Sequence, residues 1–168
     1  IAEGTRAAEL ENQRRQLARL YLGLFGRAPD KRGFDFWAAG LAAGTPLAQV
    51  AGDMLKSPEA LALGLLPDTL TTEQYNDKLV NLAYVNLMGR APNAAELADA
   101  KAALGAPPSA AHAGFLVELG SRVAGDSTGG APVDPAARTL LFEKTTVALA
   151  YAAIQPKDPN DTEQIIAV

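Results

Sequence analysis

A short sequence, Gly-Arg-Ala-Pro, occurs twice in this chain, at residues 26–29 and 89–92, and it constrains the fold more than any other feature. Each copy follows an apolar, helix-forming stretch. Glycine accepts the left-handed turn that ends a helix, and proline prevents the helix from continuing. Asp30 and Asn93 come next, and both residue types cap helix N-termini well. Each copy therefore predicts the end of one helix and the start of another.

The similarity between the two copies extends well beyond this motif. Residues 21–30 correspond to residues 84–93 at an offset of 63, and Leu55 and Ser57 recur at an offset of 64 as Leu119 and Ser121. A period near 63 is longer than that of two-helix solenoids and suits a stacked unit of three to four helices.

A third copy is degraded. Tyr151 lies 67 residues after Tyr84, but Pro156-Lys157-Asp158 then stands where the other copies have Gly-Arg-Ala. Because the chain opens at Ile1 and stops at Val168 in mid-pattern, we interpret it as a piece of a longer protein.

Composition and periodicity favour an all-α fold. Hydrophobic residues make up 48% of the chain, much of it Ala and Leu, whereas aromatic residues make up only 6%. This balance suits helices packed through small side chains better than a β-sandwich. We expect about eight to ten helices of 8–20 residues. They should form two similar stacked multi-helix units, residues 5–66 and 67–125, plus a C-terminal helical segment at residues 134–168, which is a partial third unit.

The last helix of this scheme, residues 136–155, carries a row of large apolar and aromatic residues: Leu140, Val147, Tyr151 and Ile154.

Charge and cysteine content exclude several kinds of function. The net charge is −4, so there is no basic surplus for a nucleic-acid backbone, and nucleic-acid binding is disfavoured. No apolar run approaches the ~20 residues that a membrane span needs. Without cysteine the chain has no disulfides, no thiolate metal sites and no cysteine nucleophile.

Four residues are the candidates for contact with a glycan or a protein partner. Arg27 and Arg90 follow the helix-ending glycines, where each guanidinium either satisfies terminal carbonyls or faces an acidic glycan or partner. Asp30 either caps a helix or ligates calcium, and its exchange for Asn93 argues for capping. Trp37, one turn after Phe34, is either a core anchor or a platform for sugar stacking.

Metal and catalytic sites are not evident. His112 is the only histidine, and a lone histidine with alanine and glycine neighbours cannot supply a metal site or a catalytic triad, so we interpret it as an incidental helix position. Asp158, Asn160, Asp161 and Glu163 form an oxygen-rich cluster, but they lack the spacing and the central glycine of an EF-hand loop. We predict no metal ligand, no catalytic residue and no cofactor.

The motif resembles a bacterial repeat family of unknown function with the pattern LYxxxxGRxPDxxGxxxW. The resemblance is specific over residues 17–61, is partial over residues 78–125, where Glu96 replaces a glycine and Ala100 the tryptophan, and is weak after Val147. The residues that carry it are Leu20-Tyr21, Gly26-Arg27-Ala28-Pro29-Asp30, Gly33, Trp37, Leu41, Gly44 and Ser57-Pro58-Glu59. Members of this family occur in S-layer proteins, adhesins and exported calcium-binding proteins of the RTX type, so calcium enters only through this family context.

The resemblance implies a non-catalytic structural or anchoring module of an exported bacterial surface protein, S-layer or adhesin-like. Such a module would be secreted to the cell surface and would bind cell-surface polysaccharide or sister subunits, with oligomers forming through the full-length protein. An intracellular helical scaffold that binds another protein is the alternative. A third hypothesis is an enzyme whose residues converge only in three dimensions.

Overall fold

The computed structural model describes residues 2–126 and 134–154, and all regular structure in these ranges is helical, which confirms the all-α prediction. None of the helices in this part of the chain combines the length and apolar character needed to cross a bilayer. The helices are α1 (Ala2–Phe25), α2 (Lys31–Ala42), α3 (Leu47–Leu55), α4 (Pro58–Ala62), α5 (Thr72–Met88), α6 (Ala94–Leu104), α7 (Ala110–Ala124) and α8 (Pro135–Ile154).

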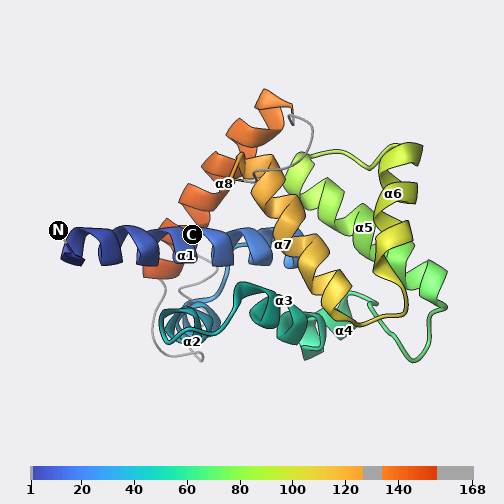
Figure 1. The fold of residues 1–168 in the computed structure, drawn as a ribbon, viewed down its shortest axis with the longest axis horizontal. Coiled ribbons are helices and arrows are strands. Elements are labelled where there is room, and N and C mark those ends of the chain that lie inside the picture. The colour runs from blue at the N-terminus through green and yellow to red at the C-terminus, as the bar shows by residue number, and fades with distance from the viewer. Residues whose placement is uncertain (1, 127–133, 155–168) are drawn as a thin grey trace.

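Helix α1 is the element around which the others pack (Figure 1). It contacts α5, α7, α8 and α2, and more weakly α3 and α4. Its C-terminal half is apolar on nearly all sides: Leu17, Leu20 and Leu24 are all buried. A helix of this character needs neighbours on every side, which explains its central position. The buried apolar residues of α1 to α8 form one hydrophobic core.

The two Gly-Arg-Ala-Pro segments end and start helices as the sequence predicts. Gly26 and Gly89 adopt left-handed φ angles of 67° and 73°, directly after α1 and α5. Asp30 then caps α2 by accepting a hydrogen bond of 2.7 Å from the Gly33 amide. Asn93 caps α6 in the same way by accepting one of 2.8 Å from the Glu96 amide. Conformational freedom at the glycine and a side-chain cap therefore fix both corners.

Equivalent helices of the two units pack against each other, α1 on α5 and α3 on α7. One close approach lies near the C-terminal ends of α1 and α5. There the Asn86 side-chain amide donates a hydrogen bond of 3.0 Å to the carbonyl of Gly23, the equivalent residue 63 positions earlier. A Cβ on Gly23 would lie 3.1 Å from the Leu87 side chain, so glycine lets the two helices approach. The duplicated units therefore share one interface and one core.

Helix α8 does not use the apolar row that the sequence suggests. Val147 and Ile154 are 66% and 68% exposed, and Leu140 is exposed as well, whereas Leu24 and Leu87, the counterparts of Ile154, are buried. The buried face of α8 consists mostly of small residues: Ala137, Leu141, Thr145, Ala148 and Ala152. Small side chains permit close packing of α8 on α1, and the large apolar side chains then point outward.

Candidate functional site at the repeat junctions

Arg27 is held by residues of its own unit. Its Nε and Nη2 donate hydrogen bonds of 2.7 and 2.8 Å to the two carboxylate oxygens of Glu59 at the start of α4. Its Nη1 donates one of 2.8 Å to the carbonyl of Ala28. Asp30 adds a looser ion pair at 3.7 Å. The planar guanidinium thus ties the junction after α1 to α4 by the two-pronged geometry that arginine makes with carboxylates.

Tyr21 and Trp37 lie beside this ion pair. The Arg27 guanidinium lies 5.8 Å from the centroid of the Tyr21 ring. Burial and the nearby charge of Asp30 raise the pKa of the Tyr21 hydroxyl, which stays neutral, and Trp37 lies beside it. A Cβ on Gly33 would lie 2.7 Å from the Tyr21 hydroxyl oxygen, so only glycine fits there. The first junction is therefore a close-packed cluster.

The same cluster leaves an aromatic edge on the surface. Trp37 is half-buried and packs against the core, whereas Phe36 beside it is 68% exposed. The two rings meet edge to face with their centroids 4.9 Å apart. Packing of Trp37 against the core holds this edge in place on α2.

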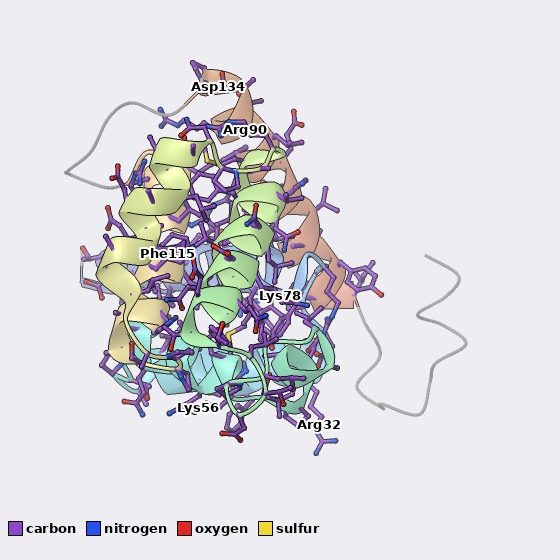
Figure 2. The ribbon with its side chains drawn as sticks, turned by 90° about the vertical axis from the view of Figure 1, so that its right-hand side faces the viewer. Arg32, Lys56, Lys78, Arg90, Phe115 and Asp134 are labelled. Carbon is purple, nitrogen blue, oxygen red and sulfur yellow. The ribbon has the colours of Figure 1, made fainter. Side chains whose placement is uncertain are left out.

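Arg90 occupies the equivalent place in the second unit but takes its carboxylate from a different helix. Its Nη1 and Nη2 each donate a hydrogen bond of 2.8 Å to Glu96 of α6, and its Nη1 also donates one of 3.0 Å to the carbonyl of Ala91. These contacts lower the pKa of Glu96 to about 2 and raise that of Arg90. Arg90 lies at the same end of the molecule as Asp134 (Figure 2).

The four residues singled out from the sequence therefore fall into two clusters. Arg27, Asp30 and Trp37 come together around Tyr21, and Arg90 belongs to the second cluster. Both guanidinium groups are engaged by glutamates, which supports the interpretation that they stabilise the helix junctions. Among these side chains, the Phe36–Trp37 edge is the part that remains open to a ligand.

His112 is not the incidental position that the sequence suggests. It is fully buried, and the Ser109 amide donates a hydrogen bond of 3.2 Å to its Nδ1. The proton therefore resides on Nε2, which donates a hydrogen bond of 2.8 Å to Asn76 Oδ1. Asn76 in turn donates one of 3.0 Å to the carbonyl of Gly105. Burial lowers the pKa of His112, so the ring is a neutral structural link between α7 and α5.

Metal ligands do not converge in the part of the chain that the structure describes. No group of three or more histidine, aspartate or glutamate side chains there is arranged to hold a metal ion. The oxygen-rich cluster at Asp158, Asn160, Asp161 and Glu163 lies outside the described residues.

Sequence reasoning missed an arginine-lined cleft between α1, the end of α7 and the first half of α8. Arg15, Arg19 and Arg138 line it together with Asp126 and Phe142. One signal was available. Arg19 lies on the buried side of α1, and the equivalent positions in the other two copies are Leu82 and Leu149. A charged residue at a repeat position that is otherwise apolar indicates a local role.

Comparison with known proteins places a family match on the first unit. Residues 10–63 match the family described as a domain of unknown function (DUF4214). This range runs from within α1 to just beyond the end of α4, and it includes the whole first junction with Arg27, Trp37 and Glu59. The comparisons with curated proteins and with solved structures found no match to the chain.

Proposed function

We propose that this chain is a non-catalytic anchoring module of an exported bacterial surface protein, S-layer or adhesin-like, and that it binds cell-surface polysaccharide. The surface setting comes from the resemblance of its repeat motif to modules of such proteins. The observation that carries the binding function is the exposed aromatic edge formed by Phe36 and Trp37 on α2.

Two properties of this edge support sugar binding. An aromatic ring offers a flat apolar face on which the C–H groups of a sugar ring pack, and Phe36 presents such a face to solvent. The edge is also held in place, because Trp37 packs against the core and the junction is closed by Arg27 and Glu59. Rigid aromatic anchors lose little conformational entropy on binding.

The experiment is a binding assay of the purified chain with immobilised bacterial lipopolysaccharide, run with calcium and with a chelator. Phe36→Ala should weaken binding at least tenfold without changing the circular dichroism spectrum. Val147→Ala is the matched control, since Val147 is 66% exposed and Phe36 68%. Its binding should equal that of the unmodified chain.

Failure of the unmodified chain to bind with or without calcium would contradict the proposal, as would equal losses in Phe36→Ala and the control. Calcium-dependent binding would add the ion to the mechanism. Fractionation of cells that produce the full-length protein tests the surface setting separately. Recovery from the cytoplasm alone would favour the intracellular scaffold.

A further inference from the structure

The arginine-lined cleft has the size and lining of a small-ligand site. Its volume is about 610 Å³, within the range of ligand pockets in proteins. Three helices contribute to it or border it. Asn12, Arg15 and Arg19 lie on α1, Arg138 and Phe142 lie on α8, and Asp126 follows the end of α7.

The charge of the cleft is opposite to that of the whole chain. Three arginines and one aspartate line it, which gives a formal charge of 3 − 1 = +2, whereas the chain carries −4. A local positive charge in a hollow attracts and concentrates anions. The positive charge is therefore local to the cleft and does not follow from the composition of the whole chain.

Arg19 is the buried base of the cleft. Its side chain is 8% exposed and forms an ion pair of 2.9 Å with Asp126. This pair joins α1 to the end of α7. Burial of a guanidinium where the other repeats carry leucine lowers its pKa and costs solvation energy, which one carboxylate offsets in part. The base of the cleft is therefore the buried, charged guanidinium of Arg19.

Arg15 and Arg138 also line the cleft. The Arg15 guanidinium lies 4.6 Å from the centroid of the Phe142 ring, which is 61% exposed. The Arg138 guanidinium packs against Gly125, where a Cβ would come within 2.9 Å of it. Among the ion pairs of the described residues, neither arginine has a partner. Two guanidinium groups that no described carboxylate neutralises and an exposed ring therefore border one cavity.

We infer that this cleft binds a compact ligand that carries a carboxylate or phosphate beside an apolar face, such as an acidic sugar. Arg15 and Arg138 contact the anion in the two-pronged manner of arginine, and the Phe142 ring packs against the sugar. The bound anion neutralises the positive charge of the cleft that Asp126 does not compensate. This site is separate from the aromatic edge of α2, so the inference does not depend on the proposed function.

The test is an NMR titration of the isotope-labelled full chain at constant ionic strength. The probes are galacturonate, trigalacturonate, glucose 1-phosphate and inorganic phosphate, with maltotriose as the neutral probe. Amide shifts from an acidic sugar should cluster in residues 12–19 and 135–145. If trigalacturonate binds more tightly than galacturonate, the source of the anion is a polymer. If the two bind with equal affinity, the source is a free acidic sugar.

The double variant Arg15→Gln/Arg138→Gln should weaken the acidic sugars at least tenfold. Both side chains reach solvent, so the fold should survive, and Arg19 is left in place. Arg32→Gln/Lys56→Gln is the matched control, because it also removes two positive charges, at the end of the molecule opposite Asp134 (Figure 2). Its affinities should stay unchanged.

Several results would overturn the inference. They are no binding of either acidic probe class, equal binding of maltotriose, inorganic phosphate binding as tightly as the sugars, and equal losses in the double variant and in its matched control, Arg32→Gln/Lys56→Gln. The proposed function is judged separately: loss of lipopolysaccharide binding in Phe36→Ala but not in the double variant would show that it does not use this cleft.

Discussion

Arg90 and Glu96 form a bidentate ion pair in the second unit, whereas the equivalent Arg27 is paired with Glu59, a residue from another helix. At the offset of the repeat, Glu96 corresponds to Gly33, and Glu59 corresponds to Val123, which is buried. Each unit therefore pairs its junction arginine with a glutamate, but the glutamate comes from a different helix in each unit. The constant feature of the junction is the neutralised guanidinium.

The acid stability of the chain should depend on Glu96. Its folded-state pKa is about 2 against an ordinary 4.5, so the unfolded chain binds more protons between these values. Its contribution is present above pH 4.5 and is lost as the pH falls from 4.5 through 2. Glu96→Gln should lower the free energy of unfolding at pH 7 by about 1 kcal/mol and by much less at pH 2.

Urea denaturation across this pH range measures the effect. Glu73→Gln is a suitable control, since this more exposed glutamate shares Lys101 with Asp77. A loss that does not change with pH in Glu96→Gln would contradict the prediction.

The pairing of Arg27 with Glu59 should be visible in a double-mutant cycle. Arg27→Ala, Glu59→Ala and the double variant should give a coupling energy of about 1 kcal/mol, because the contact is two-pronged but partly exposed. The free energy of unfolding is the quantity to measure. A coupling energy near zero would show that Arg27 does not stabilise the junction through Glu59. Arg27 would then again be a candidate for contact with a ligand.

Glycine at position 33 should be required by Tyr21. Alanine normally favours a helix over glycine by about 1 kcal/mol, yet a Cβ here would lie 2.7 Å from the buried Tyr21 hydroxyl. Gly33→Ala should therefore destabilise the chain by about 1–3 kcal/mol. Gly114→Ala on α7 is the matched control, since nothing lies within 4 Å of its Cβ, and it should stabilise the chain. Thermal melts of both variants should shift in opposite directions.

Stability should also fall as the pH drops below 6.5, because of His112. Burial lowers its folded-state pKa, so the unfolded chain takes up the proton first, and the contribution of the neutral ring is lost as the pH falls. NMR of the only histidine in the chain should give a pKa below 6.5. His112→Gln should remove the slope of stability against pH that begins near 6.5. A histidine pKa at or above 6.5 would contradict the buried neutral ring.

Much of the local structure could be predicted from the sequence. The turns at Gly26 and Gly89 and the caps at Asp30 and Asn93 depend on a few neighbouring residues, so their residue types are sufficient to identify them. The environment of Trp37 could not be predicted, because its neighbour Tyr21 belongs to the preceding helix. Two residues that come together across the turn between two helices have no characteristic separation in the sequence.

The outer surface of α8 and the arginine cleft could not be predicted for a related reason. The row containing Val147 and Ile154 has the same period as a buried face, and periodicity does not say which of two faces turns inward. The face with the small residues turns inward because α8 packs closely on α1. That same approach brought Arg138 of α8 near Arg15 and Arg19 of α1.

The sequence by itself determined where helices end and begin, that the unit is duplicated, and that the fold is all-α, because caps, turns and helical periodicity are local properties. The tertiary structure alone decided which carboxylate neutralises each junction arginine, that His112 is a buried link, and that three arginines line one cleft. Those outcomes depend on contacts between distant helices, whose geometry is set by packing of the whole core.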